Sequence, residues 1–128
     1  MLIGCPREIK NQEYRVGLTP ESAKELIKHG HTVWIESGAG MGIGATDAQY
    51  RAAGAEIVEN PERIFADCEM VVKVKEPQPG ERAQLHLGQV LYTYLHLAPD
   101  PEQTADLVKS GVTAIAYETV TGLSLIHI

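Results

Sequence analysis

The sequence predicts an α/β fold, a three-layer Rossmann-like (flavodoxin-like) domain with a mainly parallel sheet. Short apolar runs alternate with segments that carry helix-start signals, and this alternation is typical of right-handed βαβ crossovers. Several runs are apolar without polar alternation, which indicates strands covered on both faces. We expect six strands, at Leu2–Cys5, Thr32–Glu36, Ala55–Val58, Met70–Val74, Gln89–Tyr94 and Val112–Tyr117.

Three expected helices begin with the same signal, a capping side chain followed by proline and glutamate. The cap accepts a hydrogen bond from a first-turn amide, proline suits the first helical position, and the acid interacts with the positive end of the helix dipole. The capping residues are Thr19, Asn60 and Asp100. The first of these helices is predicted to end at Gly30 and to bury a stripe of Ala23, Leu26 and Ile27.

The last expected helix covers Glu102–Ser110 and ends at Gly111. Asp100 and Gln103 have the spacing of a capping box, in which two side chains cap each other's backbone amides. The residues that this helix is predicted to bury are Ala105, Leu107 and Val108.

The composition indicates one globular domain in the cytoplasm. With 128 residues and a net charge of −6, the chain has no excess of basic residues for a nucleic acid or an anionic membrane. No apolar run approaches the ~20 residues that span a bilayer, and Met1–Gly4 leads directly into charged residues rather than a signal peptide. Cys5 and Cys68 lie in or beside apolar runs, so we expect buried free thiols.

A glycine-rich segment follows the second expected strand. Gly40–Ala45 fits G-x-G-x-x-A, the loose form of the dinucleotide-binding fingerprint. In that fingerprint the glycines open a helix directly, whereas here the better helix caps, Thr46 and Asp47, lie beyond them. We therefore favour a tight strand–helix connection over a site for nucleotide phosphates, which remains the alternative.

Two cations follow expected strands. Arg15 lies in the loop after the first strand, where its planar fork can bind a carboxylate with two hydrogen bonds, or can pair with Glu8 or Glu13 at the surface. Lys75 follows the run Met70–Val74, where it can bind an anion or extend into solvent. Lys73, which shares a face with Lys75, is expected to reach solvent.

His96 follows the fifth expected strand. It can be a general acid/base near neutral pH, or a loop histidine among leucines. Since the carboxyl ends of parallel strands share one edge, Arg15, Lys75 and His96 together predict a pocket for a small carboxylate whose neighbouring carbon exchanges protons. No His, Cys, Asp or Glu has metal-ligand spacing, so no metal site is expected.

Four segments in order resemble the alanine dehydrogenases, from Met1 to about Thr121. Transhydrogenases share the R-V-x-x-T-P opening and the Gly-Ala-Gly loop, whereas the second and third segments favour alanine dehydrogenase. The segments are Gly4–Pro20, Lys73–Pro77, Tyr94–Ala98 and Ala116–Val120.

The resemblance implies reversible NAD-dependent oxidative deamination of L-alanine to pyruvate and ammonia. It implies that Arg15 and Lys75 bind the carboxylate and carbonyl ends of the substrate, and that His96 is the acid/base. It also implies a homo-oligomer, and NAD bound by a domain that would follow this segment. The alternatives are the N-terminal domain of a proton-translocating transhydrogenase and a non-catalytic module that binds small carboxylates.

The expected domain organisation is an incomplete substrate domain at 1–121, followed by a tail at 122–128 that does not resemble the family. Because hydride transfer needs a bound acceptor, we expect this chain to be inactive by itself.

Overall fold

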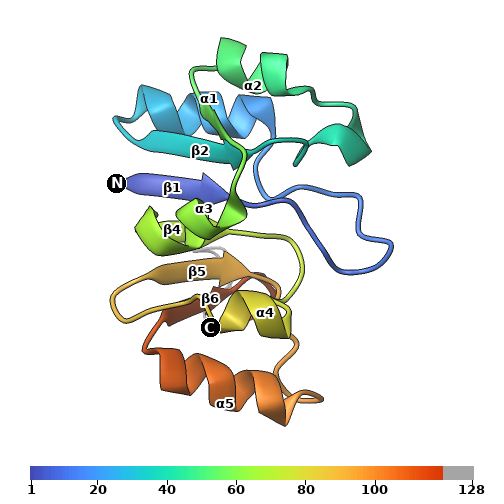
Figure 1. Cartoon of the computed structure of the whole chain (residues 1–128), viewed down its shortest axis with the longest axis vertical. Coiled ribbons are helices and arrows are strands. Elements are labelled where there is room, and N and C mark those ends of the chain that lie inside the picture. The colour runs from blue at the N-terminus through green and yellow to red at the C-terminus, as the bar shows by residue number, and fades with distance from the viewer. Residues whose placement is uncertain (120–128) are drawn as a thin grey trace.

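A computed structural model of the chain describes residues 1–119. The expected tail at 122–128 lies outside the described residues. Six parallel strands form one sheet in the order β3-β2-β1-β4-β5-β6 (Figure 1). The predicted α/β Rossmann-like class is confirmed, and the order is the Rossmann order rather than the flavodoxin order 2-1-3-4-5. The strands are β1 (Leu2–Cys5), β2 (Thr32–Glu36), β3 (Glu56–Val58), β4 (Met70–Val72), β5 (Val90–Thr93) and β6 (Thr113–Ala116).

All six predicted strands form, and four are shorter than expected. The run Met70–Val74 shows the reason, since its strand β4 ends at Val72. The amide of Val74 donates to the Glu8 carboxylate at 3.0 Å instead of to the neighbouring strand.

The predicted caps are confirmed at all three helices. Thr19, Asn60 and Asp100 each accept a hydrogen bond from a first-turn amide. Thr46, one of the two caps proposed beyond the glycine segment, forms a full capping box with Gln49. The helices are α1 (Pro20–Lys28), α2 (Asp47–Ala52), α3 (Pro61–Asp67), α4 (Pro79–Arg82) and α5 (Pro101–Ser110), with short 3₁₀ turns η1 (Met41–Ile43) and η2 (Tyr117–Thr119).

The core has two layers, one on each face of the sheet. On one face α1 and α2 cover residues such as Ile3 and Ile35, and on the other α3 and α5 cover residues such as Val71 and Leu91. The approach of α3 requires Gly4, because a Cβ there would overlap Ile64 and Cys68. Both cysteines are buried free thiols as predicted.

The prediction for α5 is partly wrong. Leu107 is buried, but Ala105 is exposed and Val108 is 78% exposed. The helix lies at the end of the sheet against α4, so residues 1–119 cover only one narrow stripe of it. The capping box is half formed, since Gln103 turns away from the amide of Asp100 and donates to the carbonyl oxygen of Leu95 at 2.7 Å.

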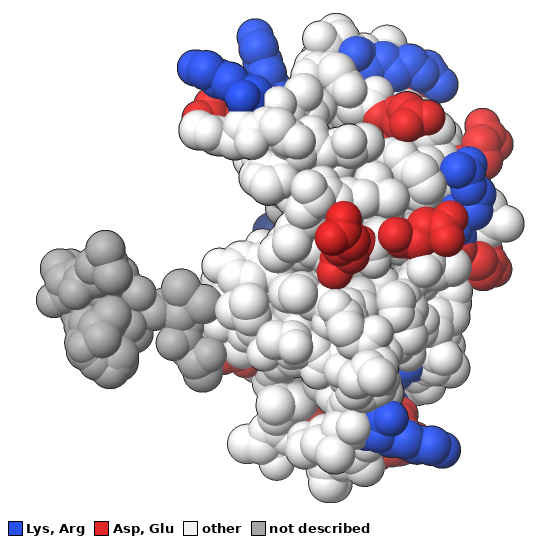
Figure 2. Space-filling model, turned by 90° about the vertical axis from the view of Figure 1, so that its left-hand side faces the viewer, with Lys and Arg blue, Asp and Glu red and all other residues white. Residues whose placement is uncertain are grey.

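Charged side chains of both signs are spread over the surface. On the face at the amino ends of the strands, Figure 2 shows acidic and basic residues interspersed, without a continuous basic patch on the described part of that face. Among residues 1–119, no helix has the length and apolar character needed to cross a bilayer.

Candidate functional site

The site lies between the parallel strands β1 and β4, where the order in which strands are added to the sheet reverses. β1 and β4 pair with each other, while β2 and β5 lie on their outer sides. In open α/β sheets, ligands bind outside the carboxyl ends of strands at such a switch point. Figure 1 shows the loop from β1 to α1 and the loop from β4 to α4 leaving the sheet at this one edge.

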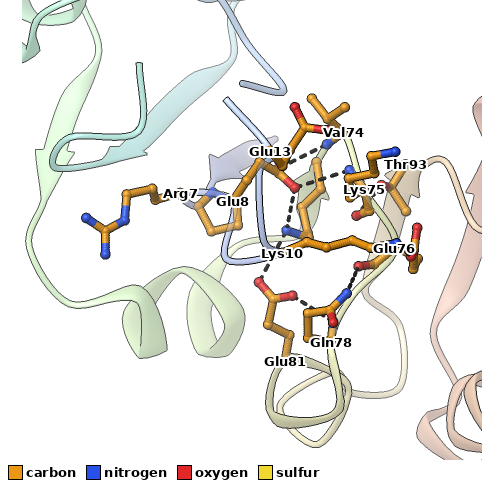
Figure 3. A network of polar contacts seen from close by, with 12 residues as sticks. Arg7, Glu8, Lys10, Glu13, Val74, Lys75, Glu76, Gln78, Glu81 and Thr93 are labelled. Atoms are coloured by element: carbon orange, nitrogen blue, oxygen red, sulfur yellow. Dashed lines mark hydrogen bonds and ion pairs between the residues drawn. The ribbon is translucent and has the colours of Figure 1, made fainter. Parts of the chain in front are cut away.

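A buried group of charges connects the loop after β1 with the loop after β4 and with α4. We call Glu8, Lys73 and Glu81 the buried ion cluster; Figure 3 labels Glu8 and Glu81. The Lys73 ammonium lies 3.1 Å from the Glu8 carboxylate and 3.2 Å from that of Glu81. The three side chains are between 1% and 6% exposed. A buried ammonium needs such partners, because an unpaired charge in the interior is very costly.

The expectation that Lys73 reaches solvent is therefore wrong. Lys73 directly follows β4, whose last two residues are buried, so its side chain remains in the interior. Sequence reasoning considered Glu8 only as a partner of Arg15 and missed Glu81. The usable signal was the lysine within a run covered on both faces, which requires buried carboxylates from neighbouring loops.

The Glu8 carboxylate also fixes the backbone that carries Lys75. It accepts hydrogen bonds from the amides of Val74 and Lys75 at 3.0 and 3.1 Å. The Thr93 hydroxyl, at the end of β5, donates to the carbonyl oxygen of Lys75 at 2.9 Å. The main chain of Lys75 is thus held, as Figure 3 shows, by Glu8 from the loop after β1 and by Thr93 at the end of β5.

Arg15 and Lys75 line one open cavity of about 430 Å³, which we call the anion pocket. The sequence predicted this proximity, and the two side chains come from the two loops at the switch point. The Lys75 ammonium makes no hydrogen bond or ion pair within residues 1–119, whereas neighbouring Lys10 is paired with Glu76. The remaining lining residues are Lys10, Asn11, Gln12, Glu13 and Tyr14.

The guanidinium of Arg15 binds an internal carboxylate. Its Nε and Nη2 donate to the two oxygens of Glu13 at 3.1 and 2.9 Å. Of the two partners that the sequence allowed, Glu13 rather than Glu8 takes this role. The hydrogen bonds from Arg15 lower the pKa of Glu13, and those to Glu13 raise the pKa of Arg15.

His96 lies at the same edge of the sheet but does not line the anion pocket. It follows β5 with a left-handed backbone, φ 51°, and its side chain is 55% exposed. The Glu118 carboxylate holds this turn, accepting the amides of Leu95 and His96 at 3.0 and 2.8 Å. The Tyr94 ring stacks on the imidazole of His96, with the ring centroids 6.3 Å apart.

The glycine segment packs against the loop that lines the anion pocket, and it does not open a helix as the dinucleotide fingerprint does. Its glycines form η1 and a turn, and α2 starts only after them, at the Thr46 cap. A Cβ on Gly42 would overlap the carbonyl oxygen of Tyr14, so this glycine allows the two loops to touch. Among the described residues, no group of His, Cys, Asp and Glu could hold a metal ion.

A slightly larger cavity, about 470 Å³, lies between α4 and α5. Its buried arginine, Arg82, is already paired with Asp106 at 2.8 Å. The anion pocket, which lies at the carboxyl ends of the strands at the switch point, is therefore the better candidate for an anionic ligand.

The family model for the alanine dehydrogenase/PNT N-terminal domain matches residues 4–125. The alanine dehydrogenase of Bacillus subtilis is 54% identical over 121 residues, which are 94% of this chain and 32% of that protein. The alanine dehydrogenase of Methanococcus maripaludis is 51% identical over 120 residues, again 94% of this chain and 32% of the relative. The chain thus spans about a third of the length of these relatives.

Solved structures of the same family also resemble this chain. An L-alanine dehydrogenase superposes with a TM-score of 0.92 and 52% identity, covering 97% of this chain and 34% of the other. A transhydrogenase from Sinorhizobium meliloti is more distant, with a TM-score of 0.85 and 26% identity, covering 91% of this chain and 34% of the other.

Proposed function

Because this chain belongs to the alanine dehydrogenase/PNT N-terminal domain family, we propose that it is the substrate-binding part of an L-alanine dehydrogenase. The reaction of the whole protein is then the reversible, NAD-dependent oxidative deamination of L-alanine to pyruvate and ammonia. By the same likeness, the whole protein is proposed to be a cytoplasmic homo-oligomer.

The observation that carries the proposal is the position of Arg15 and Lys75 in one cavity at the switch point of the sheet. A guanidinium fork matches a carboxylate, and a neighbouring ammonium can bind and polarise a carbonyl oxygen. Pyruvate has both groups on adjacent carbons. In this proposal Arg15 binds its carboxylate and Lys75 binds its carbonyl oxygen.

We assign the acid/base role to His96. An imidazole near the substrate can transfer a proton as water adds to the imine carbon and ammonia leaves. The His96 side chain is 55% exposed, and its Nδ1 lies 3.9 Å from the Glu118 carboxylate, so in this proposal it leaves this contact and the Tyr94 ring to reach a bound substrate. The role of His96 thus requires a rotation of its side chain, which pyruvate binding is expected to produce.

NAD, when bound, would supply the acceptor for the hydride from the α-carbon of alanine, and we propose that it is held by a part of the whole protein outside this chain. Two observations support this proposal: the glycine segment does not open a helix, and the relatives are about three times as long as the aligned region. We accordingly expect no alanine-dependent NADH formation by the 128-residue chain. Turnover at a rate typical of enzymes, ~1–1000 s⁻¹, would contradict this assignment.

The direct test is pyruvate binding by the ¹⁵N-labelled chain, followed by NMR titration. Millimolar pyruvate is expected to shift the Arg15 side-chain and Lys75 backbone resonances. Arg15→Ala and Lys75→Ala should each abolish saturable binding, whereas Lys24→Ala, which removes an exposed cation on α1, should leave it unchanged. Equal binding by all variants would rule out this pocket.

A transhydrogenase domain is the second candidate, and the Sinorhizobium meliloti structure supports it. Transfer of hydride between nucleotides involves no amino acid, so this candidate predicts no pyruvate binding in the same titration. A carboxylate-binding module, the third reading, predicts binding by Arg15 and Lys75 but no alanine oxidation by the full-length protein.

A further inference from the structure

We propose that Glu13 is an internal competitor of the substrate: its carboxylate occupies the Nε–Nη2 edge of the Arg15 guanidinium in the ligand-free chain, and it must leave before a substrate carboxylate can bind that edge. The inference rests on the proposed function, since it assigns a role to a third residue of the same pocket.

The contact between Glu13 and Arg15 has the geometry of a bound carboxylate. Nε and Nη2 of Arg15 each donate to a different oxygen of Glu13, and the Arg15 amide donates to one of them at 2.7 Å. The Glu13 side chain is 5% exposed, whereas that of Arg15 is 59% exposed. The carboxylate therefore lies inside the pocket wall, and the guanidinium closes over it from the solvent side.

The Glu13 carboxylate also lies in the field of both cations that the proposed substrate requires. Hydrogen bonds from Arg15 are the main cause of its lowered pKa, and Lys75 adds a further electrostatic contribution. A ligand carboxylate between Arg15 and Lys75 would occupy the same field. Glu13 thus takes the place of the substrate both in shape and in charge.

The loop that carries Glu13 is built differently from the part that carries Glu8. The Glu8 carboxylate binds a buried ammonium and two backbone amides of another loop, all of them fixed by the sheet. The partners of Glu13 all belong to Arg15, two residues along the same loop, and a turn closed by the Glu13 amide and the Lys10 carbonyl precedes it. Glu13 can therefore rotate out without breaking the sheet, because only local contacts hold it.

Competition by Glu13 lowers the apparent affinity of the pocket for a carboxylate ligand by a fixed factor. A ligand that needs the free Arg15 fork binds only to the fraction of molecules in which Glu13 has left, so its apparent Kd rises by the inverse of that fraction. The factor is the same for every carboxylate. Weak monocarboxylates, which gain nothing from Lys75, are thereby kept from occupying the pocket at low concentration.

The test compares pyruvate and acetate titrations of four ¹⁵N-labelled chains. They are the wild type, Glu13→Gln, Glu13→Asp and the charge-matched control Glu25→Gln, which removes an exposed carboxylate paired with His29 on α1. Glu13→Gln should bind both ligands about fivefold more tightly than the wild type. The factor is modest because Arg15 is exposed, and solvent weakens its interaction with Glu13. Glu13→Asp keeps the charge but shortens the reach, and should bind more tightly than the wild type. Glu25→Gln should match the wild type.

The Arg15 Nε–Hε resonance gives a readout that needs no substrate. It should differ between the wild type and Glu13→Gln before any ligand is added. If it does not, the internal contact is absent in solution and the inference is wrong. Equal or weaker binding by Glu13→Gln would also overturn it, because Glu13 would then support the pocket instead of competing.

The inference and the proposed function can fail separately. Should pyruvate fail to bind any chain while acetate binds Glu13→Gln more tightly than the wild type, the competitor role stands and the proposed substrate is wrong. Should pyruvate bind the wild type and Glu13→Gln equally, and Arg15→Ala not at all, the pocket stands and the competitor role is wrong.

Discussion

The buried ion cluster and the anion pocket are built from the same two loops, yet their charges behave differently. Lys73 and Lys75 are two residues apart; the first is 1% exposed between two carboxylates, and the second makes no ion pair within residues 1–119. In the cluster the one cation, Lys73, has two fixed partners. In the pocket Lys10 has a distant partner in Glu76, whereas Arg15 pairs only within its own loop and Lys75 has no ion pair among residues 1–119. Whether a charged side chain stabilises the fold or is available to a ligand therefore depends on its burial and on the number of its fixed partners, rather than on its residue type.

The largest expected effect is that of Glu8→Ala. The substitution leaves Lys73 with one carboxylate and removes the acceptor of two amides, so the free energy of unfolding should fall by about 3–5 kcal/mol. Urea denaturation measures this loss. Glu13→Ala is the matched control from the pocket and should cost less than about 1 kcal/mol. Equal losses of unfolding free energy in the two variants would show that the cluster and the pocket do not differ in their contribution to stability.

Substitutions of Lys73 and Lys75 test the same difference between the cluster and the pocket. The first should affect stability, and the second should affect pyruvate binding. Lys73→Met leaves the carboxylates of Glu8 and Glu81 buried without a cation, and should destabilise the chain by about 3 kcal/mol. Lys75→Met removes no ion pair and should change stability by less than about 0.5 kcal/mol while abolishing pyruvate binding. Thermal unfolding and the pyruvate titration check both. A stable Lys73→Met chain would show that the cluster is not essential to the fold.

Gly42→Ala probes the contact between the glycine segment and the pocket. The added Cβ would overlap the Tyr14 carbonyl oxygen, so we expect a loss of about 1–2 kcal/mol of stability and weaker pyruvate binding, since the loop of Arg15 must move. Gly80→Ala, in α4, is the control, because its Cβ would meet no neighbouring atom within 4 Å. Unchanged binding by Gly42→Ala would mean that the glycine segment does not position the pocket.

The smallest expected effect concerns Cys5, which is buried beside the cluster. Burial, the largest cause, raises the pKa of its thiol to about 12, with a smaller contribution from Glu8. The unfolded chain ionises this thiol near pH 9, so the thiol's contribution to stability is complete below pH 9 and falls as pH rises towards 12. At pH 10 the loss should be about 1 kcal/mol relative to Cys5→Ala, measured by urea denaturation at pH 8 and 10. An identical pH dependence in both chains would contradict a buried thiol.

Much of the fold could be predicted because its signals are local. The caps Thr19, Asn60 and Asp100 bind amides two or three residues away, so a short window of sequence contains both partners. The sheet class followed from the alternation of strands and helices. The exposure of Val108 could not be foreseen, because it depends on which part of α5 the rest of the molecule covers.

The site was predictable only in part, for the same reason. Arg15 and Lys75 follow strands that end at one edge, so their proximity could be inferred from the parallel sheet. The partners of Lys73 lie 65 and 8 residues away and could not be assigned without knowing how the loops cross. From the sequence, either Glu8 or Glu13 could be the ion-pair partner of Arg15, and only the geometry of the loop identifies Glu13 as the partner.

The hydrogen bonds of Glu8 to the loop after β4 also bear on the order of folding. They join residues 65 to 67 positions apart, across the pairing of β1 with β4, whereas β1 and β2 can pair through α1 alone. Closing so long a loop is slow compared with local pairing. The pocket should therefore be among the last parts of the chain to assemble, and the recovery of pyruvate binding during refolding would time the docking of the second half of the sheet on the first.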